Sequence, residues 1–261
     1  MAAKPKTRPG SIVPYVNNQG VRIHYEVVGA GPPLFLHHQT FGSLESWQDF
    51  GYLNALKRDR QLILMDARGH GASDKPHDPS AYSLPLRVGD VTAVLDDLGI
   101  GQTDYFGYSL GGWIGFGLAR YAPPRLRSLI LGGAHPYAEN MQVFRDMMPQ
   151  DPGAFIAMLE KVFGPHMTPA IRARLLANDL KALLVLTQDR DSLADILPTM
   201  TMPCLLFAGD ADPRLPQVQE CTKELSNATF FAVPASDHLA SLARSDLVLP
   251  HVRAFLADLR Q

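Results

Sequence analysis

One serine, Ser109, lies in the glycine-rich stretch DYFGYSLGGWIGFG at residues 104–117. Gly107 to Gly111 fit the pattern G-x-S-x-G, which is typical of a serine held on a sharp turn between a strand and a helix. Glycines on both sides of such a turn avoid collisions between side chains and the neighbouring backbone. The N-terminus of the following helix directs free N–H groups towards developing negative charge. Ser109 is therefore a candidate nucleophile, provided that a base takes its proton.

The same glycines allow other interpretations. Gly111, Gly112, Gly115 and Gly117 would also let a helix pack closely on a sheet, whether or not Ser109 reacts. A dinucleotide-binding loop does not fit, because the glycines at 107, 111 and 112 lack the G-x-G-x-x-G spacing. The strand and helix patterns that flank Ser109 favour the nucleophile.

We expect the base to follow the serine along the chain, because scaffolds with a serine on this strand–turn–helix motif have the order serine, acid, histidine. Four histidines follow Ser109: His135, His166, His238 and His251. His251 lies inside an amphipathic helical pattern, and His166 lies in a purely helical segment. His238, in PASDHLASL, follows the last strand candidate, where a loop can reach the carboxyl edge of a sheet. We predict His238 as the base.

The acid should also follow the end of a strand. Asp210 and Asp212 both lie just beyond the apolar run at 204–208. Asp212 lies further into the loop and precedes Pro213, whereas Asp210 could instead cap the turn. We favour Asp212 as the group that fixes the histidine tautomer and stabilises the imidazolium.

Short apolar runs alternate with helical patterns along the chain. Several runs are apolar without alternation, as expected of strands covered on both faces. The strand candidates are 11–16, 20–29, 33–38, 61–66, 103–108, 128–133, 203–210 and 229–234, and helical patterns occupy 84–99, 110–122 and 245–259. This repetition predicts an α/β fold with a mostly parallel, doubly wound central sheet. The first two strands are expected to pair antiparallel across the NNQG turn.

Residues 136–200 break the alternation, because they consist of consecutive helical patterns, including 153–164 and 169–188, with no clear strand. The segment is rich in methionine and phenylalanine: Met141, Phe144, Met147, Met148, Phe155, Met158, Phe163 and Met167. We expect most of these side chains to pack helices together, while an inner face lines an apolar pocket. The predicted organisation is a core at 1–135 and 201–261 with a helical cap inserted at 136–200.

Composition excludes several classes of partner. A net charge of −2 and a pI near 6.5 give no reason to expect nucleic acid, and the basic residues at 1–9 read as a solvated end. No apolar run has the length of a membrane span, and the first residues lack a signal-peptide core, so we expect a cytoplasmic protein that binds no membrane. Cys204 and Cys221, without a metal-binding spacing, are expected to be structural. The sequence carries no signal of an oligomeric state.

Four motifs together resemble those of the α/β-hydrolase-fold family, and the likeness covers the chain from about residue 12 onward. GYSLGG resembles the family's nucleophile elbow, and MDARGHGASDKP its D-x-R-G-x-G-x-S loop. GDADPRLP matches the acid-bearing G-x-x-D-x-x-x-P, and SDHLASL resembles the histidine loop. The resemblance implies Ser109, Asp212 and His238 as a catalytic triad. It also implies that 136–200 is a lid between the sixth and seventh strands of the family.

The resemblance further implies an oxyanion hole, where this chain departs from the family pattern. The family usually has His-Gly after its third strand, whereas this chain has PLFLHHQTFG. If His38 corresponds to the family histidine, Gln39 takes the glycine position and the Thr40 N–H donates. If His37 corresponds to it, the Gln39 N–H donates instead. The Leu110 N–H is the second donor in either alignment.

We expect a serine hydrolase that acts on a small-to-medium carboxylic ester or lactone, with water as co-substrate and without a metal or other cofactor. His37 and His38 are not expected to share a metal ion, because adjacent strand residues point to opposite faces. Thioester hydrolysis, carbon–carbon bond hydrolysis and cofactor-free perhydrolysis use the same triad, and a non-catalytic small-molecule receptor is an alternative from another class. Epoxide hydrolases and dehalogenases of the family would carry aspartate at the elbow. The candidates to border the substrate pocket are His38, Trp47, Tyr108, Trp113 and His135.

Overall fold

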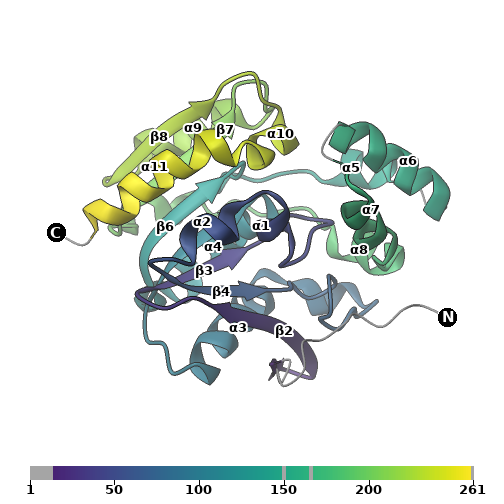
Figure 1. Ribbon diagram of the computed structural model, residues 1–261, viewed down its shortest axis with the longest axis horizontal. Helices are drawn as coiled ribbons and strands as arrows, with labels where there is room; N and C mark the ends of the chain where they lie inside the picture. The colour runs from purple at the N-terminus through teal and green to yellow at the C-terminus, as the bar shows by residue number, and fades with distance from the viewer. Residues whose placement is uncertain (1–13, 149–150, 165–166, 260–261) are drawn as a thin grey trace.

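Eight strands form one sheet at the centre of the computed structural model, which describes residues 14–148, 151–164 and 167–259 (Figure 1). Their order across the sheet is β1-β2-β4-β3-β5-β6-β7-β8. β2 pairs antiparallel with β1 and β4, and all other neighbours are parallel. The strands are β1 (Tyr15–Asn18), β2 (Val21–Val28), β3 (Pro33–His37), β4 (Gln61–Met65), β5 (Thr103–Tyr108), β6 (Leu126–Gly132), β7 (Cys204–Gly209) and β8 (Ala228–Val233). The predicted mostly parallel α/β sheet is confirmed.

Helices cover both faces of this sheet, which explains why its central strands are apolar without alternation. Every residue of β5 and β7 is buried. One core cluster joins alternate strand residues to α3 (Leu84–Asp97), α4 (Leu110–Tyr121) and α9 (Leu215–Glu224). A second cluster joins the other strand residues to α1 (Ser46–Asp49), α2 (Tyr52–Leu56), α10 (His238–Ala243) and α11 (Ser245–Asp258). Two short 3-10 helices, η1 (Pro79–Tyr82) and η2 (Pro123–Arg125), precede α3 and β6.

The first hairpin has the predicted pairing but a tighter turn. β1 continues to Asn18, so the turn consists of Gln19 and Gly20 rather than the whole NNQG segment. Both residues have positive φ, 51° and 86°, as the type I′ hairpin turn requires. The predicted strand at 11–16 begins outside the described residues, as does the basic segment at 1–9.

Between β6 and β7 the chain forms α5 (Gln142–Met147), α6 (Pro152–Phe163), α7 (Pro169–Leu176), α8 (Leu180–Leu186) and the 3-10 helix η4 (Ala194–Thr199). Figure 1 shows α5–α8 gathered at one end of the molecule, beyond the point of the β6 arrow. The prediction of one continuous helix at 169–188 is wrong, because α7 ends at Leu176 and α8 begins at Leu180. Asp179 caps the N-terminus of α8, because its carboxylate accepts the Ala182 N–H. This local hydrogen bond favours a new helix at this point over the continuation of α7.

The methionine and phenylalanine side chains of this segment mainly pack. Phe155 and Met148 are buried in the second core cluster, Met158 and Met167 pack against it, and Phe144 stacks on Phe41. The side chains of Met147 and Phe163 and the whole of His166 lie outside the described residues. The division into core and cap stays a prediction.

The two cysteines are buried and unpaired, as expected of structural residues. Burial raises the pKa of the Cys204 thiol to about 12, so this side chain is protonated at neutral pH. No helix within the described ranges combines the length and apolarity needed to cross a bilayer.

Candidate active site

Ser109 lies between the last residue of β5 and the first residue of α4, in a strained conformation. Its φ and ψ are 53° and −106°, a region that side chains normally avoid and that costs on the order of 1–3 kcal/mol. The Ser109 N–H donates to the Gly132 carbonyl at 2.8 Å, which ties the turn to the end of β6. The strain therefore persists because the neighbouring strands fix the turn on both sides.

The glycines around Ser109 are required by close backbone contacts. A Cβ on Gly107 would lie 2.3 Å from the Gly111 carbonyl oxygen, and a Cβ on Gly111 would lie 2.2 Å from the His37 carbonyl oxygen. Both distances are far below a normal contact, so neither position accepts a side chain without a shift of backbone. Further along α4, a Cβ on Gly115 would meet the Leu131 side chain at 2.6 Å. The two interpretations of the glycines thus apply to different residues.

Ser109, His238 and Asp212 meet at the carboxyl edge of the sheet. His238 Nε2 lies 2.9 Å from Ser109 Oγ, and His238 Nδ1 lies 2.6 Å from Asp212 Oδ2. The three side chains come from the loops after β5, β7 and β8, which the parallel strands bring together. This arrangement can transfer a proton from the serine to the histidine while the carboxylate stabilises the imidazolium.

The two candidate acids take separate roles. Asp212 is 3% exposed, and its carboxylate also accepts the Arg214 N–H at 2.9 Å. Burial raises the pKa of Asp212, but the hydrogen bonds from His238 and the Arg214 N–H, together with the His238 charge, bring it below its usual value. Asp210 instead accepts the N–H groups of Ala235 and Ser236 at 2.9 and 3.1 Å. Asp210 therefore shapes the loop that carries the histidine.

Three features hold His238 in place. Asp237 caps α10 by accepting the N–H groups of Leu239 and Ala240. The Tyr108 hydroxyl donates to the His238 carbonyl oxygen and lies 2.8 Å from Ser241 Oγ. Gly133 has a φ of 58°, and a Cβ there would lie 2.8 Å from His238 Cε1, so glycine leaves room for the ring.

His135 and His251, the other described histidines downstream of the serine, lie apart from these contacts. His251 stacks on Phe231 of β8 with ring centroids 4.0 Å apart. His135 is 7% exposed, and burial lowers its pKa.

The loop after β3 is held by His38. The Ala67 N–H donates to His38 Nε2 at 3.0 Å, so Nδ1 carries the proton and donates to the Gln39 carbonyl at 2.7 Å. The Thr40 N–H makes no hydrogen bond to another described residue. Leu110, as the first residue of α4, has no intrahelical partner for its N–H. Because neither N–H group has a hydrogen-bond partner among the described residues, both can donate to a ligand.

His37 has a different partner from His38. Its Nδ1 lies 2.7 Å from the Tyr105 hydroxyl, which also donates to the Gly111 carbonyl beneath the elbow. Within the part of the chain that the structure describes, no three His, Cys, Asp or Glu side chains are grouped as metal ligands.

A family model of the alpha/beta hydrolase fold matches residues 32–177. The chain belongs to the α/β-hydrolase family. This α/β-hydrolase is 27% identical to a candidate 2-succinyl-6-hydroxy-2,4-cyclohexadiene-1-carboxylate synthase of Bacillus subtilis (strain 168), over 93% of this chain and 97% of that protein. Several other curated relatives match over less than half of their own length.

Solved structures resemble this α/β-hydrolase over nearly the whole chain. A hydrolase from Pseudomonas aeruginosa PA01 has a TM-score of 0.84 at 25% identity, with 95% of this chain and 99% of that chain covered. The N-acyl homoserine lactone degrading enzyme Est816 has a TM-score of 0.74 at 26% identity, with 93% and 100% covered. The names of these similar proteins differ: one is a synthase, one a hydrolase and one a lactone degrading enzyme.

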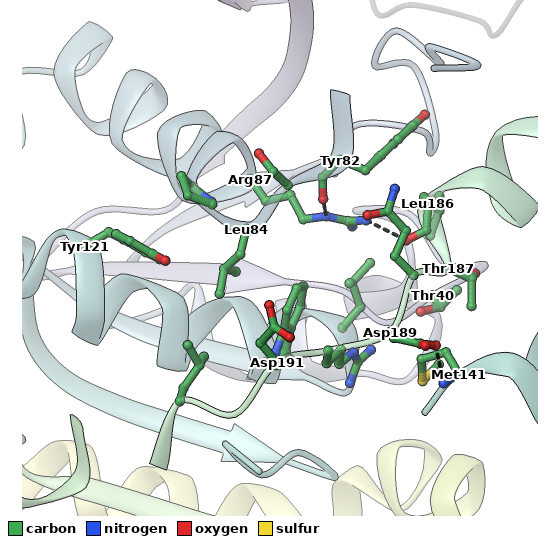
Figure 2. A pocket seen from close by; sticks show the side chains of 17 residues that line it. Thr40, Tyr82, Leu84, Arg87, Tyr121, Met141, Leu186, Thr187, Asp189 and Asp191 are labelled. Carbon is green, nitrogen blue, oxygen red and sulfur yellow. Dashed lines mark hydrogen bonds between the residues drawn. The ribbon is translucent and has the colours of Figure 1, made fainter. Parts of the chain in front are cut away.

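The α/β-hydrolase has a cavity of about 270 Å³ that is lined by Thr40 and by Leu110, the residue after Ser109, but not by Ser109, His238 or Asp212 themselves (Figure 2). Residues 82–85, Arg87 and α4 form one part of its wall, and the end of α8 with residues 187–191 and Leu193 forms another. Gln39 does not line this cavity but a separate, smaller recess. The position of Thr40 therefore favours its N–H over that of Gln39 as the oxyanion donor.

Of the five predicted pocket residues, Trp113 lines this cavity and the other four do not. His38 is fully buried in its loop, and Trp47 is buried against Tyr52 and Phe106. Tyr108 points away from the cavity because it follows the strand alternation to the opposite face, where it contacts α10. His135 is packed beside Tyr137.

Two arginines that line the cavity, Arg87 and Arg190, were not among the predicted residues. For Arg87 a signal existed, because it occupies a position on the apolar stripe of α3 formed with Leu84, Val88 and Val91. An arginine on the buried face of a helix needs a partner or a ligand.

Proposed function

We propose that the protein is a serine hydrolase that cleaves a small-to-medium carboxylic ester or lactone through an acyl-enzyme. The observation that carries this proposal is the chain of hydrogen bonds from Asp212 through His238 to Ser109, with the serine strained at the elbow. Such an arrangement activates a hydroxyl for attack on a carbonyl carbon.

In the first half of the reaction, Ser109 Oγ attacks the substrate carbonyl while His238 Nε2 takes its proton. The Thr40 and Leu110 N–H groups hold the oxyanion of the tetrahedral intermediate. Asp212 stabilises the imidazolium without accepting its proton. The imidazolium then gives the proton to the leaving oxygen, the bond to that oxygen breaks, and the acyl group remains on Ser109.

In the second half, His238 takes a proton from water as the water attacks the acyl carbonyl. The same N–H groups hold the second oxyanion. When this intermediate collapses, the proton returns to Ser109 Oγ and the carboxylic acid leaves. For a lactone, acid and alcohol are the two ends of one hydroxy-acid product.

Three observations favour an ester or lactone of modest size. The cavity of about 270 Å³ is slightly below the usual range for small-molecule sites. Serine at the elbow gives an acyl-enzyme, whereas epoxide opening in this family calls for aspartate there. Est816, at 26% identity, is named as a lactone degrading enzyme. The name of the Bacillus subtilis relative, a synthase, does not add to this support.

Turnover of a panel of activated esters and lactones by the wild type and by Ser109→Ala tests the proposal. We expect the alanine variant to lose about 10⁴-fold or more in kcat. Ser226→Ala is the matched control, because Ser226 is an exposed serine between α9 and β8, and it should keep the wild-type rate. Hydrolysis by Ser109→Ala at the wild-type rate would refute the mechanism. A wild type that binds these compounds without multiple turnover would favour the receptor alternative.

A further inference from the structure

Arg87 of α3 is a buried guanidinium with an unused donor beside the cavity. Its Nε donates to the Tyr82 carbonyl at 2.7 Å and its Nη2 to the Leu186 carbonyl at 2.6 Å, as the dashed lines in Figure 2 show. The side chain is 3% exposed, and Nη1 has no hydrogen-bond partner among the described residues. A buried donor without a partner costs stability, so this atom is a candidate to bind a ligand.

Among the described residues, no carboxylate is hydrogen-bonded to Arg87. Arg68 is paired with Asp90 through two hydrogen bonds of 2.6 Å, and Arg190 is paired with Glu139 at 3.0 Å. Burial, followed by the charges of Arg190 and Arg68, lowers the pKa of Arg87 to about 9. Arg87 is therefore still charged at neutral pH, with carbonyl oxygens rather than a carboxylate as its hydrogen-bond partners.

Trp113 of α4 adds a second unused donor to the same cavity. Its indole Nε1 is buried without a hydrogen-bond partner among the described residues. Its ring lies 5.9 Å from the Arg87 guanidinium and 4.9 Å from the Arg190 guanidinium. Among the described residues that line the cavity, the unpartnered buried side-chain atoms are thus both N–H donors.

Two aspartates also line the cavity, and neither forms a hydrogen bond or an ion pair with Arg87. Asp189 accepts the Met141 N–H at 2.9 Å and a hydrogen bond from Arg145 at 3.0 Å. Asp191 is exposed, so solvent screens its charge.

Asp90, three residues along α3, is a carboxylate whose charge acts on Arg87, but its oxygens already accept hydrogen bonds from Arg68 and Asn18. A ligand carboxylate can therefore supply the acceptor that Nη1 lacks.

We propose that Arg87 and Trp113 bind a carboxylate group of the substrate, so that the preferred substrates are esters or lactones that carry a free carboxylate. A carboxylate offers only hydrogen-bond acceptors and carries the charge that a guanidinium and an indole N–H can receive together. This inference rests on the proposed function, because it names the substrate class of the same site.

A matched pair of substrates tests the inference on the wild type. The mono-4-nitrophenyl ester of glutaric acid and 4-nitrophenyl pentanoate share a leaving group and a chain length, and the first carries a carboxylate. We expect kcat/KM to be about 10- to 100-fold higher for the charged ester, mainly through a lower KM. Glutarate should also inhibit hydrolysis of the neutral ester competitively, whereas pentanamide should not.

Equal kcat/KM values for the two esters, with no inhibition by glutarate, would overturn the inference and leave the proposed function standing. If neither ester is hydrolysed, the panel of esters and lactones described above decides the proposed function, and calorimetry with glutarate decides the inference. Binding of glutarate to the wild type would support the carboxylate subsite, and no binding would overturn it.

Variants of the cavity test whether Arg87 and Trp113 cause the preference for the charged ester. In Arg87→Gln and Trp113→Phe, the ratio of the two kcat/KM values should fall about 10-fold, towards one. This ratio is independent of the concentration of folded enzyme, so partial misfolding does not change it. Arg253→Gln is the control, because Arg253 is an exposed arginine of α11 on the opposite face, and its ratio should equal that of the wild type. An unchanged ratio in both cavity variants would contradict the assignment.

Discussion

Asparagine at position 212 removes the charge beside His238 while it keeps the size of the side chain. In the wild type the carboxylate lies 2.6 Å from Nδ1 and so requires the tautomer that leaves Nε2 free to accept the serine proton. An asparagine amide can donate to Nδ1 instead, which places the proton on Nε2 and blocks that acceptance. The same exchange in a well-studied triad lowers kcat about 10⁴-fold, which corresponds to about 5.5 kcal/mol in the activation free energy. We expect a loss of this size in Asp212→Asn.

Asp210→Asn is the matched control, two residues away on the same loop. Its carboxylate binds the N–H groups of Ala235 and Ser236, and an asparagine oxygen can replace one of these bonds. We therefore expect Asp210→Asn to keep kcat within about 10-fold of the wild type. Steady-state kinetics on one activated ester near neutral pH measures both variants, and circular dichroism verifies that both are folded. A greater loss in Asp210→Asn than in Asp212→Asn would refute the assignment of the acid.

Three further predictions concern the scaffold and the pH dependence. Gly111→Ala should destabilise the fold by about 3 kcal/mol in urea denaturation, because its Cβ meets backbone, whereas Gly101→Ala, with open space around it, should not. Tyr108→Phe removes the hydroxyl that bonds to the carbonyl of the proposed base, and we expect kcat to fall about 10-fold with KM unchanged. His24 contacts Asp66 at 2.7 Å; burial lowers the His24 pKa, but the Asp66 hydrogen bond and charge raise it overall. His24→Gln should therefore lower the free energy of unfolding by about 1.5–3 kcal/mol below about pH 6.5. The difference from the wild type should shrink as the pH rises through the raised pKa of His24. A difference that stays constant with pH would contradict this pairing.

The sheet could be predicted because strands covered on both faces need continuous apolar runs. The elbow could be predicted because its requirements are local, namely a strand, two glycines, a serine and a helix in sequence. The meeting of Ser109, Asp212 and His238 follows from topology, since parallel strands bring the loops after their carboxyl ends to one edge. Asp210 and Asp212 lie only two residues apart on the same loop. The sequence favours Asp212 because it lies further into the loop and precedes Pro213, and the structure places Asp212 beside His238.

The pocket could not be predicted in the same way, because it depends on which side chains of distant segments point to one space. Aromatic residues near Ser109 in sequence were expected to border it, but Tyr108 alternates to the opposite face of β5 and holds His238 from there. His38 is occupied by the Ala67 N–H, a partner that only the folded loop provides. Arg87 donates to the Leu186 carbonyl at the end of α8, a contact between distant segments that only the folded chain provides.

The central claim is that Ser109 forms a covalent acyl intermediate. Labelling with a fluorophosphonate, followed by mass spectrometry of the digested protein, tests it most directly. We predict one adduct per chain, on the peptide that contains Ser109, with activity lost in proportion to labelling and no adduct on that peptide in Ser109→Ala. Full labelling of another residue, or full ester hydrolysis by protein whose Ser109 is completely labelled, would contradict the claim.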